Sequence, residues 1–139
     1  MQTAGYSGTP LAKKLGIKEG CILRLINQPS YYLQLFEDFP ANVKIIKDPK
    51  TKVDCIHFFV FKAKELNDSI RSLRGQIQQN GFIWISWYKK SANIATDVTE
   101  DFVRTLALQN GLVDIKVCAI DHQWSGLKLV IPVKDRKKS

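Results

Sequence analysis

Apolar residues along this chain alternate between short unbroken runs and helically spaced positions, which predicts an α/β protein. Leu66, Ile70, Leu73 and Ile77 are separated by four, three and four residues, which predicts one apolar face of a helix. The run from Val53 to Phe61 is nearly all apolar, so we expect a central strand covered on both faces. The strands predicted in this way cover residues 21–26, 43–46, 53–61, 82–87, 113–120 and 127–133.

Capping residues predict where the first two helices begin. Thr9 is expected to be the N-cap of a short helix whose first residue is Pro10 and which ends at Gly16. Ser30 can cap a second short helix that runs as far as Phe36.

The two longer helices have clear end signals. Asn80-Gly81 is expected to stop the helix that carries the spaced apolar residues. Asp97 and Glu100 have the spacing of a capping box, with Asp97 as the N-cap of a last helix. Asn110-Gly111 is expected to close that helix.

The order of the elements predicts a three-layer, Rossmann-like α/β fold with a mainly parallel sheet. Residues 121–126 form a connection short enough for the last two strands to make an antiparallel hairpin. A closing hairpin after the last helix is typical of class I methyltransferase-like folds. No repeat or low-complexity linker divides the chain, so residues 1–133 are expected to form one domain, followed by a basic tail at 134–139.

Three polar stretches interrupt this pattern, at residues 5–10, 87–97 and 124–128. The predicted topology brings them to one rim of the sheet. Ligands of parallel α/β sheets bind outside the carboxyl ends of the strands. The start of the first helix is expected at the same rim, where free N–H groups and lysines would favour a phosphate or carboxylate. The candidate ligand-binding residues are Thr9, Asn27, Lys89, Lys90, Ser91, Trp124, Ser125 and Lys128.

Several of these residues also have a purely structural explanation. Lys89 and Lys90 can belong to an ordinary solvated loop, and Trp124 can cover the hairpin or form a wall of the site. Lys128 lies in an apolar strand, where period-two alternation can point it to solvent. Asp97 is expected to be a helix cap rather than a catalytic acid.

Motifs for catalysis and cofactor binding are missing. Asn27-Gln28-Pro29 follows the first strand, where dinucleotide and S-adenosylmethionine folds need glycine for close backbone approach. The sequence has no Walker loop and no nucleophile elbow. His57 lies mid-strand and is expected in the core, which leaves His122 at the rim as the one candidate acid–base. We therefore predict no cofactor and assign no catalytic residue.

Composition limits the class of protein further. The chain has 139 residues, 45% of them hydrophobic, and lacks both a secretion signal pattern and an apolar run long enough for a bilayer. Cys21, Cys55 and Cys118 lie in separate apolar segments without paired spacing, which argues against disulfides and a zinc site. The expectation is a cytoplasmic protein without metal or membrane contact.

The net charge of +8 favours anionic partners. The tail supplies +3 of this charge, and the remaining +5 is ordinary for a soluble domain. Aromatic and basic residues do not alternate on one strand face, so an RNA-recognition sheet of the RRM type is not indicated.

Some long motifs resemble those of an uncharacterised bacterial family, known only as a domain of unknown function. Its opening is similar to residues 5–18, GYSGTPLAKKLGIK, and its other hallmarks look like TDVTE at 96–100 and WSGLKLV at 124–130. Residues 111–119 and the Lys89-Lys90-Ser91 loop also match, whereas residues 30–52 match least. The resemblance implies a small cytoplasmic bacterial protein and implies no activity.

The leading hypothesis is a binding module for a small anionic ligand at the rim. One alternative is a divergent S-adenosylmethionine-dependent transferase, against which the missing glycine loop counts. Another is a domain that meets nucleic acid or a protein partner through its basic surface.

Overall fold

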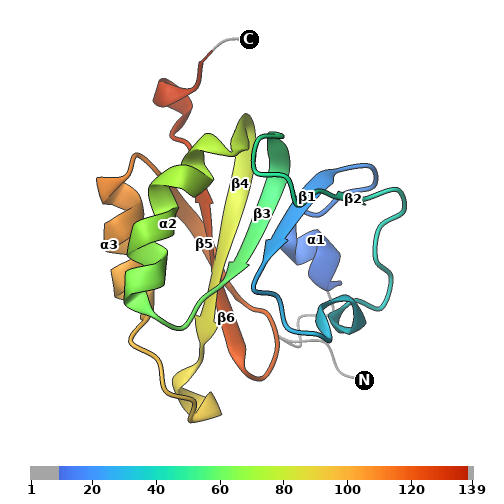
Figure 1. The fold of residues 1–139 in the computed structure, drawn as a ribbon. Coiled ribbons are helices and arrows are strands. Elements are labelled where there is room, and N and C mark those ends of the chain that lie inside the picture. The colour runs from blue at the N-terminus through green and yellow to red at the C-terminus, as the bar shows by residue number, and fades with distance from the viewer. Residues whose placement is uncertain (1–9, 138–139) are drawn as a thin grey trace.

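A six-stranded sheet runs through the molecule with helices on both faces (Figure 1). The computed structural model describes residues 10–137, and its strand order is β2-β1-β3-β4-β6-β5. The strands are β1 (Ile22–Ile26), β2 (Lys44–Ile45), β3 (Val53–Phe59), β4 (Ile77–Tyr88), β5 (Val113–Ala119) and β6 (Trp124–Val130). β6 is antiparallel to both β4 and β5, whereas the other pairs are parallel. The predicted mainly parallel sheet with a closing hairpin is confirmed.

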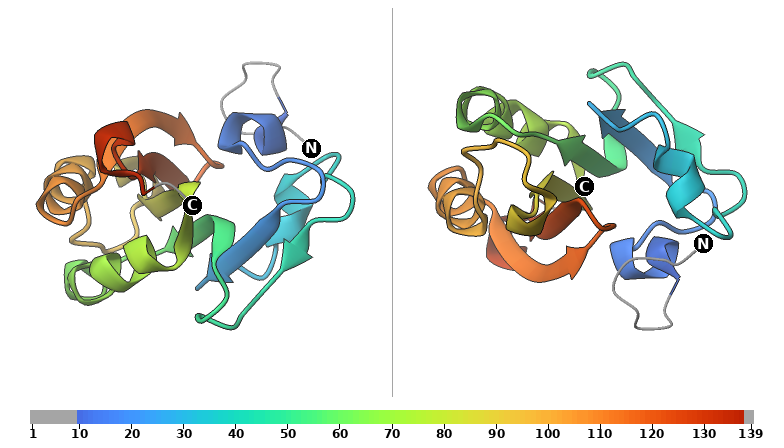
Figure 2. Two further views of the ribbon diagram at one scale, coloured as in Figure 1. Left: turned by 90° about the horizontal axis from the view of Figure 1, so that it is seen from above. Right: turned by 90° about the horizontal axis from the view of Figure 1, so that it is seen from below.

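The helices lie in two separate layers. α2 (Ala63–Gly75) and α3 (Glu100–Gln109) cover one face of the sheet, and α1 (Leu11–Leu15) covers the other (Figure 2). A short 3-10 helix, Tyr32–Leu35, packs on the α1 side. Among residues 10–137, no helix is both long and apolar enough to cross a membrane.

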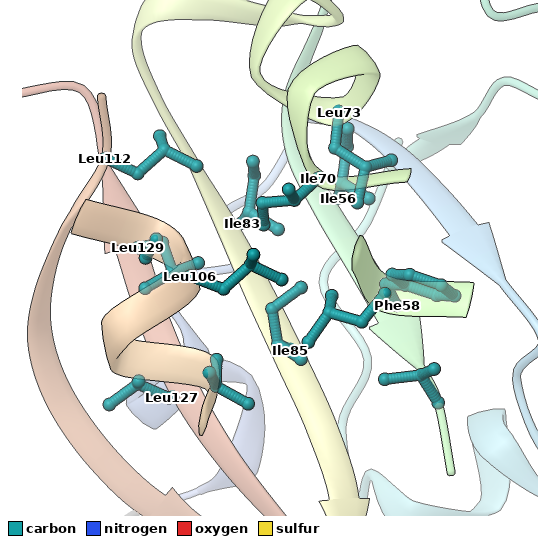
Figure 3. Packing of buried hydrophobic residues seen from close by; sticks show 14 of the residues in the cluster. Ile56, Phe58, Ile70, Leu73, Ile83, Ile85, Leu106, Leu112, Leu127 and Leu129 are labelled. Atoms are coloured by element: carbon teal, nitrogen blue, oxygen red, sulfur yellow. The ribbon is translucent and has the colours of Figure 1, made fainter. Parts of the chain in front are cut away.

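Strand alternation divides the core between the two faces. Ile56 and Phe58 of β3 pack with α2 and α3, in the cluster drawn in Figure 3. Cys55 and Phe59 point to the opposite face and pack with α1. Trp84 lies on this second face, where its indole Nε1 donates a hydrogen bond to the carbonyl of Leu15 (2.8 Å) and so fixes α1 on the sheet.

The predicted extent of the α2 helix is wrong at its end. α2 stops at Gly75, and Ile77 is the first residue of β4. Asn80-Gly81 lies inside β4 rather than ending a helix, at a bulge where the register with β3 shifts. Gly81 is needed there because a Cβ atom would lie 2.9 Å from the carbonyl oxygen of Asp54.

Two predicted caps of the short helices also differ from the structure. Pro10 itself is the N-cap of α1, with ψ of 143°, and Thr9 lies outside the described residues. Gly16 ends α1 in the left-handed region, as predicted. Tyr31 rather than Ser30 precedes the 3-10 helix, and no side chain caps it.

The cap of α3 is Thr99, whose Oγ1 accepts a hydrogen bond from the backbone N–H of Phe102 (3.1 Å). The prediction that Asp97 is this cap is therefore wrong. Asp97 instead reaches across to α2, where its Oδ1 accepts from the N–H of Ala63 (2.6 Å). It caps a helix, but a different one.

Candidate functional site

A cleft of about 810 Å³ lies at the carboxyl end of β4. It is bounded by the end of that strand, the segment that follows it and the first turn of α3, toward the bottom of Figure 1. Its lining residues are Trp87, Tyr88, Lys89, Lys90, Ile94, Ala95, Thr96, Val98, Thr99, Glu100, Asp101 and Ser125. This is the strand end at which parallel α/β sheets hold their ligands.

The apolar part of the cleft comes from residues of different exposure. Trp87 is only 6% exposed and Val98 only 2%, so both are held firmly by the core. Ile94 is 37% exposed and forms an outer, more accessible part. The cleft therefore has a rigid apolar base.

Charges of both signs surround this base. Lys89 and Lys90 directly follow β4, and Glu100 and Asp101 come from the first turn of α3. Arg104 balances the acidic side: its Nη2 lies 2.8 Å from Glu100 and its Nη1 lies 3.5 Å from Asp101. The hydrogen bonds from Arg104 to Glu100 and Asp114 raise the pKa of the guanidinium.

Backbone contacts fix the segment that borders the cleft. The N–H of Lys89 donates to the carbonyl of Gln123 (2.8 Å) and so ties the end of β4 to the β5–β6 connection. Asn93 adopts a left-handed φ of 55°, which turns the chain back toward α3. The hydroxyl of Thr96 donates to the carbonyl of Phe61 (2.7 Å), so the segment is also held to the end of β3.

The structure brings three of the predicted site residues together: Lys89, Lys90 and Ser125 line the cleft. Ser91 follows directly in a short 3-10 helix, Lys90–Ala92, and is exposed, but does not line the cleft. Asn27 lies at the end of β1, where its side-chain amide donates to Glu65 Oε2 (3.0 Å). Thr9 lies outside the described residues.

Trp124 does not form an open wall. Its ring stacks on Tyr88, with centroids 4.0 Å apart, and it meets Phe59 edge-on at 4.9 Å. Its Nε1 donates to the hydroxyl of Tyr31 (3.2 Å), and only 5% of the residue is exposed. Trp124 is also the first residue of β6 rather than part of a turn, so the structure supports the covering role instead of the stacking role.

Lys128 lies away from the cleft, which corrects its predicted place at the rim. It pairs with Trp84 in the middle of the sheet, and its Nζ sits over the ring of Phe82, 4.3 Å from the centroid. Because β6 begins at the rim with Trp124 and runs away from it, four residues of strand separate Lys128 from that edge by about 13 Å.

Sequence reasoning missed the part of the cleft that comes from Trp87, Ile94 and residues 98–101. Trp87 is predicted as the end of a strand and as the start of one of the three polar stretches, but not as a ligand-binding residue, and residues 98–101 are predicted only as the start of a helix. A usable signal was present, since a helix that follows a parallel strand begins near the end of that strand.

The end of β1 is not built for close approach of a nucleotide-like cofactor. Asn27 adopts a left-handed φ of 57°, and Gln28 and Pro29 follow it without glycine. The next helical element is the four-residue 3-10 helix Tyr32–Leu35, too short to offer a helix N-terminus to a phosphate. Among the described residues, no group of three or more His, Cys, Asp or Glu is placed to hold a metal ion.

His57 is a core residue, as predicted. It is fully buried, and its Nδ1 and Nε2 form hydrogen bonds with the hydroxyls of Tyr32 (3.0 Å) and Ser86 (2.8 Å). Burial lowers the pKa of His57 to about 3. This imidazole is therefore neutral and closed to any ligand.

Comparison with known proteins identifies the fold. No family model and no curated protein matches the sequence, so the resemblance to a family of unknown function stays a prediction. Solved structures do match: magnesium protoporphyrin IX methyltransferase from Synechocystis with bound S-adenosylmethionine has a TM-score of 0.55 at 10% identity, over 86% of this chain and 74% of that one.

Two further methyltransferase-fold structures match in the same way. Ribosomal protein L11 methylase from Lactobacillus delbrueckii gives a TM-score of 0.57 at 12% identity, over 87% of this chain and 74% of that one. Fibrillarin from Aeropyrum pernix with S-adenosyl-L-methionine gives 0.56 at 16% identity, over 86% and 73%. Together with the strand order and the single antiparallel strand β6, these matches give the described chain the fold of the class I S-adenosylmethionine-dependent methyltransferases.

Proposed function

We propose that this chain is a ligand-binding domain on a methyltransferase fold, with its ligand in the cleft at the carboxyl end of β4. The observation that carries the proposal is the cleft itself. Its volume of about 810 Å³ lies within the range of small-molecule sites, roughly 300–1,000 Å³. Its rigid apolar base and its polar margins follow the usual make-up of such sites.

The lining predicts the chemistry of the ligand. Trp87 and Val98 are almost wholly buried beneath the cleft, so the apolar side chains that a ligand can reach are those of Tyr88 and Ile94, which favour a flat or apolar body. Lys89 and Lys90 favour a phosphate or carboxylate, and the carboxylates of Glu100 and Asp101 can accept hydrogen bonds from hydroxyl or amino groups. A ring-bearing metabolite with one anionic group meets these requirements.

Thermal unfolding against a panel of nucleotides, phosphorylated metabolites and aromatic carboxylates tests the proposal. A ligand present at about a hundred times its Kd stabilises a protein by roughly 2.7 kcal/mol, which raises Tm by several degrees at this size. We expect a stabilising ligand whose effect is largely lost in the double variant Lys89→Ala, Lys90→Ala.

The matched control is Lys134→Ala, Lys137→Ala, which removes the same charge from exposed positions that do not line the cleft. The control should keep the full shift in Tm. Equal loss in both variants would mean that net charge, rather than the cleft, attracts the ligand. No shift with any compound on the panel would count against a small-ligand function.

The fold comparisons favour a second candidate, a divergent S-adenosylmethionine-dependent transferase. Two of the similar structures described above hold S-adenosylmethionine. The residues after β1 do not fit this cofactor in the usual way, because Asn27, Gln28 and Pro29 all carry side chains where close backbone approach requires glycine. We therefore derive no reaction step through it.

Isothermal titration calorimetry with S-adenosylmethionine and S-adenosylhomocysteine separates the two candidates. Binding that persists in the Lys89→Ala, Lys90→Ala variant would place the cofactor outside the cleft and favour the transferase. Absence of heat at millimolar cofactor would remove that candidate and leave the binding domain.

A further inference from the structure

A group of lysines outside the cleft comes together on the α1 face of the sheet. The end of α1, the loop after it and the β5–β6 pair contribute Lys14, Lys18, Lys116 and Lys128, here called the α1 lysine cluster. Lys116 and Lys128 are cross-strand partners. Figure 2 shows α1 beside the β5–β6 pair in both views.

Contacts within the cluster are specific. The Nζ of Lys116 donates to the carbonyl of Lys14 (2.9 Å). The partial negative charge at the carbonyl end of α1 is therefore already matched by the ammonium group of Lys116. Lys128 is half-buried over the ring of Phe82. Burial, and then the nearby charges of Lys116 and Lys18, lower the pKa of the Lys128 amine.

Within the described part of the chain, ion pairs with acidic side chains do not neutralise Lys18, Lys116 or Lys128. The ion pairs among residues 10–137 involve Lys64 and Arg104, and none of them includes Lys18, Lys116 or Lys128. Asp38 is exposed and shares a shallow pocket with Lys18 at the edge of the cluster. Like charges gathered in this way cost stability, so a partner that supplies negative charge would relieve them.

We propose that the α1 lysine cluster binds the phosphate backbone of nucleic acid without reading its base sequence. The proposal is independent of the cleft and of its ligand. Lysine acts as a point charge toward phosphate, and phosphate contacts of this kind hold a protein on nucleic acid irrespective of sequence.

The surroundings of the cluster favour nucleic acid over other polyanions. Stable binding to a membrane surface usually combines charge with apolar side chains that enter the lipid, whereas Leu11, Leu15 and Ile17 beside these lysines are buried. Val117, the exposed neighbour of Lys116, pairs with Leu127 and so faces the other side of the sheet. Protein interfaces are enriched in aromatic residues and depleted in lysine, and here lysine predominates. Interfaces with nucleic acid are polar and strongly positive, as this surface is.

Fluorescence anisotropy with a labelled 20-base-pair DNA duplex, at about 50 and 200 mM salt, tests the proposal. Four phosphate contacts predict a logarithmic salt slope of about −3.6, or roughly a hundredfold loss of affinity over this range. The triple variant Lys18→Gln, Lys116→Gln, Lys128→Gln should bind more weakly and lose only about threefold over the same range.

Two matched variants separate the contribution of the α1 lysine cluster from the effects of net charge and of misfolding. Lys44→Gln, Lys47→Gln, Lys50→Gln removes the same charge from exposed positions near the opposite edge of the sheet, and should keep the steep slope. The variant Lys18→Arg, Lys116→Arg, Lys128→Arg keeps the charge and should also keep the steep salt slope. Asp38→Asn should strengthen binding, because it removes the acidic neighbour of Lys18.

An equal loss of slope in the two glutamine variants would overturn the proposal, as would absence of DNA binding by the wild-type protein. Binding to phosphatidylserine vesicles without binding to DNA would also overturn it, in favour of a lipid surface. Circular dichroism of each variant shows whether the fold is kept. Should the glutamine variant unfold, a wild-type slope shallower than −2 would contradict four contacts by itself.

Discussion

At the scale of single residues, Trp124 and His57 are both held in the core by specific contacts. Trp124 stacks on Tyr88, and His57 bridges two buried hydroxyls. The sequence predicts a core role for His57, because an imidazole within a long apolar run has no access to solvent. It does not decide the role of Trp124, because a tryptophan at a strand end can cover either a neighbouring ring or a ligand.

The buried imidazole predicts a pH dependence of stability. Its pKa is about 3 in the folded protein and 6.5 as the reference value, so the unfolded chain binds the proton more tightly. The stabilisation is fully present above pH 6.5 and is lost as pH falls toward 3. Between pH 6.5 and 4.5 the free energy of unfolding should fall by about 2 kcal/mol through His57 alone.

Urea unfolding of the wild type and of His57→Gln at these two pH values measures the effect. The variant should lose the part of the pH dependence that His57 causes, whereas His122→Gln, an exposed change in the β5–β6 connection, should keep it. If His57→Gln does not fold, NMR of the wild-type ring protons should still show a neutral imidazole at pH 4.5. Protonation of His57 in the folded protein near pH 6 would contradict the prediction.

At the scale of elements, the type of each element follows from the sequence better than its ends do. Leu66, Ile70 and Leu73 belong to α2 as their spacing predicts, but Ile77 continues that spacing from within β4. Both elements face the same core cluster, so burial alone extends the apparent helical period by one turn. The sequence is equally ambiguous at Gly126, since a glycine can mark either a turn or a strand position without room for a side chain. Gly126 lies in β6 rather than in a turn, and a Cβ atom there would come within 3.0 Å of Trp84.

The cap that Asp97 provides to α2 predicts which helix responds to its loss. Asp97→Ala removes the acceptor of the Ala63 N–H, and the loss of a side-chain acceptor at the start of a helix costs about 1 kcal/mol. Hydrogen exchange should become faster in the first turn of α2, because the acceptor belongs to that helix. Urea unfolding gives the accompanying change in stability.

Thr99→Ala is the companion variant, since Thr99 caps α3 through the N–H of Phe102. It should speed exchange at the start of α3 and leave the start of α2 unchanged. Faster exchange in α3 after the Asp97→Ala change would support the local cap that the sequence suggests. The same result would contradict the hydrogen bond from the N–H of Ala63 to Asp97.

At the scale of the whole molecule, the fold is predictable because alternating strands and helices allow few connections. The mainly parallel pairing follows from the alternation of strands and helices, and the final hairpin follows from the short connection at residues 121–126. The order of the strands comes from the structure. The binding surfaces are harder to predict, because they depend on where each strand begins relative to its neighbours. Lys128 illustrates this: its distance along β6 decides that it joins the lysines of the α1 face instead of those at the rim.

The position of β6 also determines at which point of chain synthesis the sheet can be completed. This strand is the last of the sheet in the sequence, yet it lies between β4 and β5. A growing chain that has reached residue 119 therefore carries two strands with unpaired edges, which is a hazard for aggregation. The final strand pairs with both β4 and β5, so a chain that ends before residue 124 leaves β4 and β5 without this partner.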